Sequence, residues 1–457
     1  MTVSEKDPTE VYVDIGGGRI QMGRLQSSVN YTRAEEENPK FLMNSTTCRV
    51  EPWNNVHSDQ LPYPELHEYW IKANISRKDY LFHTQPSPLA AYVHPEHITV
   101  TLTAENLFGK TVYCRYFDCK RKEIPHVFES KVFPESTVYC GRRIGAKFIS
   151  VTQGKYDIPE EPVPIQNRIT DGPQHYLTVC MATIYGPEPK FIQIVDFIEH
   201  HKLHGATFFH IYLRNASAYD RRLLDDYVRT GDIEVIVLND HHWRDDFMWH
   251  MTQINDCHMR SVGFSKWTAI LDIDERIEMK GGQRIVEFLD TVTNPDVVNL
   301  QFKVQWVLKD VWSPARYQND NQFLENLVFR RFHNTSRTHP WLQPKTIVRP
   351  ESIAAMTIHN PDAVYKGLIK IYVGDDIGVI RHYRNLGGGS LLNNNKRIFE
   401  VGPYSLTDVD PNMKFQLTEA CLHRVKQVYD TVPNTCEQKQ IAYDKHQLTH
   451  PCMAYKN

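Results

Sequence analysis

Two aspartates one residue apart follow an apolar run in KWTAILDIDERIEM, residues 266–279. On an extended backbone, residues i and i+2 point to the same side, so we expect Asp272 and Asp274 to present two carboxylates to one point while Ile273 packs inward. Carboxylates this close repel each other unless a cation lies between them. Hard oxygen ligands at an open edge suit Mg²⁺ or Mn²⁺, which keep coordination positions for substrate phosphates. The alternative is an ordinary solvated loop, where Asp-X-Asp is frequent.

Helices and strands that alternate after residue 175 are expected to position this pair. The predicted strands are YLTVCMATIY, ATFFHIYLR, IEVIVLN and WTAILDI, and the predicted helices cover residues 187–205, the stretch up to Gly231, and about 247–262. Strands this apolar, joined by helical crossovers, predict a mostly parallel sheet with helices on both faces. Such sheets bind their ligands at the carboxyl ends of the strands, where Asp272 and Asp274 lie.

The chain before this sheet divides into two further regions. Residues 1–78 show little periodicity and are expected to form a tail and wrapping segment. Residues 79–165 contain short alternating runs such as HITVTLTAEN, which predict a small antiparallel β-domain. The Pro-rich stretch YDIPEEPVPIQNR is expected to be a linker, because proline breaks regular structure. The α/β domain is then expected over 175–430, with a C-terminal extension over 431–457.

Composition narrows the classes of function. The 457 residues are 41% hydrophobic and 23% charged, with a formal net charge of −3. This balance gives no general reason to bind nucleic acid or an anionic membrane surface. No apolar run reaches the roughly 18 residues that a spanning helix needs, and residues 1–30 lack the apolar core of a signal peptide, so the chain as given is expected to be soluble.

Glycosylation sequons and cysteines suggest an oxidising secretory compartment. Nine cysteines are present, and Asn-X-Ser/Thr triplets begin at Asn30, Asn44, Asn74, Asn215 and Asn334. The alternative is chance sequons with buried, reduced thiols. We expect Cys180 to pair with Cys257, and Cys114 to pair with either Cys119 or Cys140.

Several common signatures are missing. The sequence has no Gly-X-Gly-X-X-Gly after the first strand and no P-loop, which removes support for dinucleotide and ATP binding. His200 and His204 have a spacing that suits a metal, but they fall in the last turn of a predicted helix. There, positive side chains interact favourably with the helix dipole, and we favour this capping role over metal binding.

Four segments, in order, carry a resemblance to a known family. They are residues 176–212, KWTAILDIDERIEM, QPKTIVRP and VIRHYR, with LAAYVHPEHITVTL and VYCRYFDC upstream. Together they resemble glycosyltransferase family 92, whose fold is of the GT-A type, over roughly residues 85–425. The resemblance implies metal-dependent, inverting transfer of a sugar, galactose from UDP-galactose, to a hydroxyl of a glycan acceptor. It also suggests β-1,4 linkage to the core fucose of N-glycans, with Mn²⁺ or Mg²⁺ as the cofactor.

The same resemblance implies roles for individual residues. Asp272 and Asp274 would hold the metal and the diphosphate, His382 would be a further metal ligand, and Arg384 would meet a phosphate because guanidinium matches phosphate geometry. For His382 the alternative is a water-exposed histidine at a sheet edge. By fold analogy, further donor contacts are expected at the strand ends and in KTIVRP, at Ala182, Thr183, Tyr185, Asn239, Asp240 and Lys345.

The catalytic base and the lid are less defined by the sequence. Asp310, Glu325, Asp375 and Asp376 are candidates for the carboxylate that takes the acceptor's proton, and we favour Glu325 and Asp310 because they follow the metal motif. NLGGGSLLNNN, residues 385–395, is either a lid over the donor or a flexible connection.

Two other classes of function compete with the glycosyltransferase. One is a secreted carbohydrate-binding protein that has lost turnover, and the other is a metal-dependent phosphoesterase. Neither nucleic acid nor a membrane is an expected partner, except through an anchor outside this chain. We expect the Golgi lumen, with the full-length protein a single-pass type II membrane protein.

Overall fold

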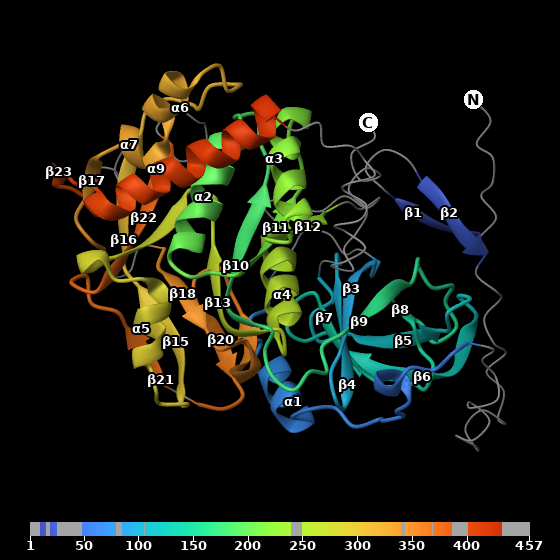
Figure 1. The fold of residues 1–457 in the computed structure, drawn as a ribbon. Helices are drawn as coiled ribbons and strands as arrows, with labels where there is room; N and C mark the ends of the chain where they lie inside the picture. The colour runs from blue at the N-terminus through green and yellow to red at the C-terminus, as the bar shows by residue number, and fades with distance from the viewer. Residues whose placement is uncertain are drawn as a thin grey trace.

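The computed structural model describes residues 10–14, 19–24, 48–78, 85–104, 106–238, 249–339, 343–367, 369–385 and 401–431. A larger α/β domain lies beside a smaller domain made of strands (Figure 1). The expectation of a mixed α/β fold is therefore confirmed. Near the N-terminus, β1 (Glu10–Asp14) and β2 (Arg19–Arg24) form a separate antiparallel pair.

A seven-stranded mixed sheet forms the centre of the larger domain. Its order is β12-β11-β10-β13-β18-β15-β21. The first four strands are parallel to one another, and β18 runs antiparallel to its neighbours β13 and β15. In sheet order, the strands are Ile233–Val237, Phe208–Leu213, His175–Ile184, Ser265–Leu271, Lys345–Val348, Val297–Phe302 and Ile369–Tyr372.

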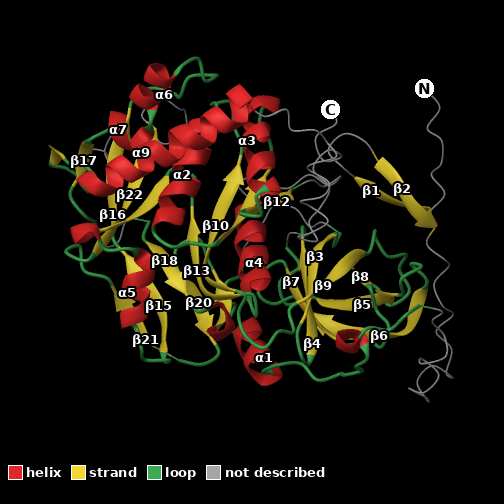
Figure 2. Ribbon diagram, viewed as in Figure 1, coloured by secondary structure: helices red, strands yellow, loops and turns green. Residues whose placement is uncertain are grey.

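Helices cover both faces of this sheet (Figure 2). The alternation of side chains along β10 explains why. Val179 and Met181 pack in the main core with α2 (Phe191–Leu203) and α3 (Ala218–Arg229), while Cys180 belongs to a second core with α4 (His250–Ser261). The last long helix, α9 (Pro411–Lys426), packs across α2 (Figure 1).

A second sheet continues from the end of β13, in the order β14-β22-β16-β17-β23. β14 pairs antiparallel with β22, and β22 pairs parallel with β16, so a strand from late in the chain is enclosed by two earlier ones. The strands are Glu275–Met279, Gly378–Asn385, Val304–Lys309, Asn334–Ser336 and Tyr404–Leu406. Shorter elements complete the domain: α5 (Ile285–Thr291), α6 (Asp320–Asn326), α7 (Val328–Arg331), and the hairpin of β19 (Ile353–Met356) and β20 (Pro361–Val364).

The smaller domain is one curled sheet in the order β6-β5-β8-β9-β3-β4-β7. An isolated bridge between Val132 and Val138 joins its two ends, which closes the curl. In sheet order, the strands are Glu123–Lys131, Thr111–Phe117, Phe148–Thr152, Val163–Asn167, Pro88–Val93, His97–Leu102 and Thr137–Gly141.

The structure contradicts the sequence expectation for this domain in two respects. The predicted linker contains a strand, β9, and β9 runs parallel to β3, so the sheet is not wholly antiparallel. Proline can take a strand position when its missing N–H is not required by the ladder. Here the ladder bond next to Pro164 is made by Ile165, whose N–H donates to the carbonyl of Lys147 over 2.9 Å.

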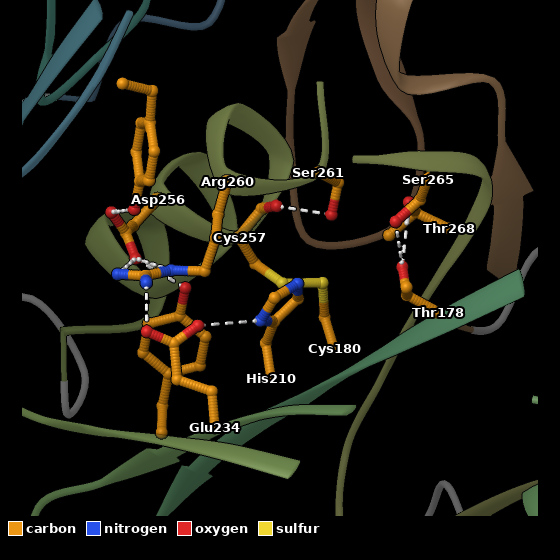
Figure 3. Close-up of a disulfide and its surroundings, with 12 residues drawn as sticks. Thr178, Cys180, His210, Glu234, Asp256, Cys257, Arg260, Ser261, Ser265 and Thr268 are labelled. Carbon is orange, nitrogen blue, oxygen red and sulfur yellow. Dashed lines mark hydrogen bonds and ion pairs between the residues drawn. A yellow bond between two sulfur atoms is a disulfide. The ribbon is translucent and has the colours of Figure 1, made fainter. Parts of the chain in front are cut away.

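A buried polar network joins the two domains. The carboxylate of Asp256 on α4 accepts hydrogen bonds from Tyr92 on β3 (2.9 Å) and Thr101 on β4 (2.5 Å). It also accepts one from Tyr212 on β11 (2.6 Å) and is paired with Arg260 (3.1 Å). Figure 3 shows Asp256 and Arg260 of this network beside the disulfide that joins α4 to β10. On the other side of the junction, α1 (Pro64–Lys72) buries His67 and Trp70.

The described part of the chain contains three disulfides: Cys48–Cys119, Cys114–Cys140 and Cys180–Cys257. The expected Cys180–Cys257 pair is confirmed, and Cys140 is the partner of Cys114. Cys421 is a buried free thiol. Asn74, Asn215 and Asn334, the sequon asparagines within the described residues, are all exposed. Among the described helices, none combines the length and the apolar character that crossing a membrane requires.

Candidate active site

Asp272 and Asp274 lie in a tight turn between two sheets. β13 ends at Leu271, β14 begins at Glu275, and the Glu275 N–H donates to the Asp272 carbonyl over 3.0 Å. The expectation of an extended backbone at the pair is therefore wrong, because the chain turns there to enter the second sheet. Both carboxylates are half-buried, with 29% and 26% of the side chains exposed. They face solvent at the carboxyl end of β13.

Asp272 is held by a lysine from the neighbouring strand. Nζ of Lys345, on β18, lies 3.1 Å from Asp272 Oδ2 and 3.3 Å from Glu275 Oε2. The same Glu275 oxygen accepts a hydrogen bond from the Asp272 N–H over 2.8 Å. Burial opposes ionisation of Asp272, but the charge of Lys345 outweighs it and lowers the pKa. Glu275 has no exposed side-chain area, and its burial and the nearby charge of Asp272 raise its pKa.

Asp274 is held by a histidine from late in the chain. The pairing of β14 with β22 places His382 opposite Glu275. Nε2 of His382 lies 3.3 Å from Asp274 Oδ2, and its Nδ1 lies 3.5 Å from Glu275 Oε1. Burial opposes the charged form of His382, but Asp274 raises the pKa of the imidazole, which in turn lowers that of Asp274. His382 is only 2% exposed, so it is not the water-exposed edge residue of the alternative interpretation.

These residues have the chemistry of a hard divalent cation site. Asp272 and Asp274 offer half-exposed carboxylate oxygens, and His382 offers Nε2 when its Nδ1 carries the proton toward Glu275. Arg384 lies beside them, with a guanidinium nitrogen 3.1 Å from His382 Nε2. Lys345 pairs with Asp272 and His382 pairs with Asp274, so each aspartate has its own positive partner. A bound cation would have to draw the two carboxylates toward itself.

The end of β10 contributes the predicted donor-side residues. Ala182 and Thr183 are buried at 9% and 6% exposure, and Thr183 Oγ1 has no hydrogen-bond partner among the residues that the structure describes. Tyr185 follows, half-buried. Its pKa is raised to about 12, first by burial and then by the charges of Asp272 and Asp274. Tyr185 therefore belongs to the same electrostatic site as the aspartates.

Four polar residues of this region did not figure in the sequence-based site. Glu275 lies within 3.3 Å of Lys345 Nζ and 3.5 Å of His382 Nδ1. His250 Nε2 lies 3.7 Å from Asp272 Oδ1. Lys309, at the end of β16, is paired with Glu188, and its charge helps to lower the pKa of Asp274. Glu275 was adjacent to the motif in the sequence. Lys309 and Glu188 offered no local signal, because only the fold brings them to the turn.

The favoured base candidates occupy different surroundings. Asp310 is exposed and directly follows Lys309 at the end of β16, close along the chain to the Lys309–Glu188 pair. Glu325 is exposed on α6, and no contact joins it to either aspartate within the described residues. Asp375 is paired with Lys303 (2.8 Å) and Thr338 (2.7 Å). Asn239, Asp240 and residues 386–395 of the proposed lid lie outside the described residues.

A separate cavity of about 580 Å³ lies at the opposite end of β13. Its lining includes Met259 and Gly263, which precede that strand, together with Tyr139 and Arg168 from the junction of the domains. Because the aspartates follow β13 and these residues precede it, the cavity is distinct from the candidate active site.

Sequence comparison identifies the family of this chain. The model of glycosyltransferase family 92 matches residues 175–438, more than half of the chain. The chain therefore belongs to glycosyltransferase family 92, and the resemblance found in the sequence is confirmed.

One curated relative supports the same assignment. It is Beta-1,4-galactosyltransferase galt-1 of Caenorhabditis elegans, 26% identical over 243 residues. The match covers 50% of this chain and 51% of the relative, so the chain spans about half the length of the curated relative it matches. Among solved structures, the mannosyltransferase PcManGT from Pyrobaculum calidifontis, in complex with GDP-Man and Mn²⁺, is 10% identical. That match covers 60% of this chain and 75% of the other, with a TM-score of 0.28.

Proposed function

We propose that this glycosyltransferase moves galactose from UDP-galactose to a hydroxyl of a glycan acceptor, with inversion at the anomeric carbon. The observation that carries the proposal is the turn at Asp272 and Asp274. It is half-exposed at the carboxyl end of β13 and is bordered by His382, Lys345 and Tyr185 from three other strands or their ends. Membership of family 92 and the galactosyltransferase relative support the choice of sugar.

Three side chains would hold the divalent cation of the reaction, Mn²⁺ or Mg²⁺: Asp272, Asp274 and His382. When bound, the ion supplies Lewis-acid stabilisation of the negative charge that grows on the departing diphosphate. Glu275 has a supporting role, because its oxygens lie 3.5 Å from His382 Nδ1 and 3.3 Å from Lys345 Nζ. It would fix the His382 tautomer that offers Nε2 to the site.

Arg384 and Lys345 differ in exposure, and we assign them different roles on that basis. Arg384 is half-buried beside His382 and would contact a phosphate of the donor. Lys345 is 2% exposed and lies between Asp272 and Glu275, so it would act by positioning Asp272 rather than by touching the donor. Ala182, Thr183 and Tyr185 would border the nucleoside, where the unpartnered Thr183 hydroxyl can hydrogen-bond. Asn239 and Asp240 remain proposed donor contacts outside the described residues.

Inversion requires a carboxylate that removes the proton from the acceptor hydroxyl as its oxygen attacks the anomeric carbon. Asp310 and Glu325 remain the proposed bases. Of the two, Asp310 is favoured by its place beside Lys309 at the end of β16, which borders the Asp274 side of the site. The proposed acceptor is the core fucose of an N-glycan, in β-1,4 linkage, and the proposed compartment is the Golgi lumen. The disulfides and exposed sequon asparagines suit that compartment.

The test follows UDP release by the purified chain with UDP-galactose, UDP-glucose or UDP-N-acetylgalactosamine, with and without Mn²⁺. Each donor is tried alone and with a core-fucosylated N-glycan. The proposal expects release that depends on both Mn²⁺ and the acceptor and is fastest with UDP-galactose. Glycan binding without any release would instead indicate a binding protein, and hydrolysis of simple phosphate esters without an acceptor would indicate a phosphoesterase.

Asp274→Asn is the informative variant, because it removes one charged ligand and keeps the shape of the side chain. Asp290→Asn is the matched control. Asp290 is an exposed aspartate on α5 that accepts a hydrogen bond from Tyr176, next to the start of β10. We expect transfer to be lost in the first variant and kept in the second. Wild-type turnover by Asp274→Asn would remove the metal assignment.

A further inference from the structure

Two histidines and a glutamate meet in a buried cluster behind β14. His200 and His204 lie at the end of α2, and Glu278 lies on β14. They are 2%, 1% and 4% exposed, respectively. One nitrogen or oxygen from each lies within 4.8 Å of the others, the one such set of three potential metal ligands in the part of the chain that the structure describes.

Hydrogen bonds outside the cluster orient two of these side chains. His200 Nε2 lies 2.8 Å from the carbonyl of Ile277, so this nitrogen carries the proton and Nδ1 keeps its lone pair. Glu278 Oε1 accepts from the Asp410 N–H over 3.5 Å. Within the described residues, the remaining oxygen, Glu278 Oε2, and both ring nitrogens of His204 have no hydrogen-bond partner.

The capping role that the sequence favoured for His200 and His204 does not apply. A favourable interaction with the helix dipole needs positive charge, whereas burial lowers the pKa of both imidazoles and keeps them neutral. The cluster instead contains several buried polar atoms that have no partner. A buried polar atom without a hydrogen bond destabilises the fold. A ligand that accepts lone pairs from both histidines and from the carboxylate would satisfy them together.

We propose that His200, His204 and Glu278 bind a Zn²⁺ ion that fixes the last turn of α2 against β14. Two imidazoles and one carboxylate are a ligand set that zinc takes, and a water would complete the tetrahedral shell. The Ile277 carbonyl that accepts from His200 is the type of outer partner that orients ligating histidines. Two of the three ligands here are imidazole nitrogens, which suit zinc, whereas the turn at Asp272 and Asp274 offers mainly carboxylate oxygens, which suit Mn²⁺ or Mg²⁺.

The position of the cluster indicates a structural role. Its residues are too deeply buried for a substrate to reach them. Glu278 lies on the strand that begins at Glu275, and that strand pairs with β22, which carries His382. A zinc ion here would stabilise the strand next to the catalytic turn without touching the donor. The site is independent of the proposed transfer reaction, so either can fail without the other.

The first experiment measures zinc by mass spectrometry in the full chain, purified from a secretory expression host and dialysed without chelator. We expect about one zinc per chain in the wild type and in Asp274→Asn, which alters only the catalytic turn. Zinc should be lost in His204→Ala and Glu278→Gln. His201→Gln is the matched control, because His201 is equally buried on the same helix but hydrogen-bonds to the Phe197 carbonyl of its own helix.

A second measurement covers the case in which the variants do not fold. X-ray absorption at the zinc edge of the wild-type protein should show imidazole nitrogens at about 2.0–2.1 Å. Removing the ion with a strong chelator should lower the melting temperature, and Zn²⁺, but not Mg²⁺, should restore it. The proposal is overturned if the wild type takes up no zinc at micromolar free ion, or if His204→Ala and Glu278→Gln retain it.

Discussion

Nε2 of His382 lies 3.3 Å from Oδ2 of Asp274, although the two residues are far apart in the sequence: Asp274 lies in the turn before β14, and His382 lies on β22. β22 forms this contact by pairing with β14 on one side and β16 on the other. The candidate active site is therefore complete only when a late part of the chain has docked onto the aspartate turn. Burial opposes the charged form of His382, and the charge of Asp274 outweighs it and raises the pKa of the imidazole.

Replacing His382 with alanine should lower kcat/KM by about 10²-fold or more. The physical reason is loss of one metal ligand, where a loss of about 3 kcal/mol of transition-state stabilisation corresponds to about 10²-fold in rate. The half-saturating Mn²⁺ concentration should also rise. Steady-state kinetics across a Mn²⁺ titration measures both quantities.

Tyr383→Phe is the control for this variant. Tyr383 is the next residue on the same strand, but its ring packs in the main core. The Tyr383→Phe variant should therefore need the same Mn²⁺ concentration as the wild type. An unchanged Mn²⁺ requirement in His382→Ala would show that His382 is not a metal ligand.

Lys345→Met should destabilise the fold by about 3–5 kcal/mol. This substitution leaves Asp272 and the fully buried Glu275 without the ammonium that lies 3.1 and 3.3 Å from their oxygens, and an uncompensated buried charge is costly. Urea denaturation measures the loss. Adding Glu275→Gln to Lys345→Met removes the negative charge of Glu275 and should recover part of the lost stability. If Lys345→Met is as stable as the wild type, the ion pair does not support the turn.

The alternation of strands and helices from β10 to β13 could be predicted from the sequence, because strands such as Ile233–Val237 are mostly apolar and the helices between them end near glycines. Asp272 and Asp274 could be found in the same way, since their place after a buried strand is a local property. The turn that they occupy could not, because it arises from the start of a second sheet at Glu275. Alternation of side chains with a period of two predicts a strand, but it does not predict where the chain leaves one sheet and enters the next.

The partners of the aspartates were harder to predict for the same reason. Lys345 and Lys309 reach the site through sheet pairing, which is set by long-range contacts rather than by neighbouring residues. β9 escaped prediction because the prolines around it outweigh a short apolar pattern. Local sequence therefore located the two candidate aspartates, and tertiary pairing determined which charges surround them.

The hydrogen bond between Tyr92 and Asp256 should couple the two domains by about 1.5–3 kcal/mol, the range for hydrogen bonds to charged groups. A double-mutant cycle of Tyr92→Phe and Asp256→Asn, measured by urea denaturation, gives this coupling energy. Tyr116→Phe is the matched control. Its hydroxyl donates to the Gly141 carbonyl within the smaller domain, so it should show no coupling to Asp256. Independent effects of Tyr92 and Asp256 would contradict the proposed link.

Loss of the Cys180–Cys257 disulfide should cost about 2–5 kcal/mol, because the bond closes a long loop between β10 and α4. The double variant Cys180→Ala, Cys257→Ala should therefore melt at a lower temperature than the wild type, as calorimetry can show. Cys421→Ala separates this effect from simple loss of a buried sulfur, because Cys421 is buried but unpaired. A similar fall in both variants would mean that packing, not the cross-link, provides the stability.

Acid should destabilise the protein below pH 6.5 through its buried histidines. His258 on α4 is fully enclosed, its Nε2 lies 3.0 Å from the Pro350 carbonyl, and burial lowers its pKa from 6.5 to about 4. The unfolded chain therefore binds this proton first as the pH falls. Stability that His258 contributes in full above pH 6.5 is lost progressively between pH 6.5 and 4, at up to about 1.4 kcal/mol per pH unit.

His258→Gln should remove this contribution, because the glutamine amide can still donate to the Pro350 carbonyl but does not titrate. The free energy of unfolding, measured by urea denaturation at several pH values between 6.5 and 4, should then fall less steeply than in the wild type. The difference in slope should approach about 1.4 kcal/mol per pH unit. His423→Gln, which replaces an exposed histidine on α9, is the control for the substitution itself. Equal slopes for His258→Gln and the wild type would mean that His258 becomes protonated without unfolding.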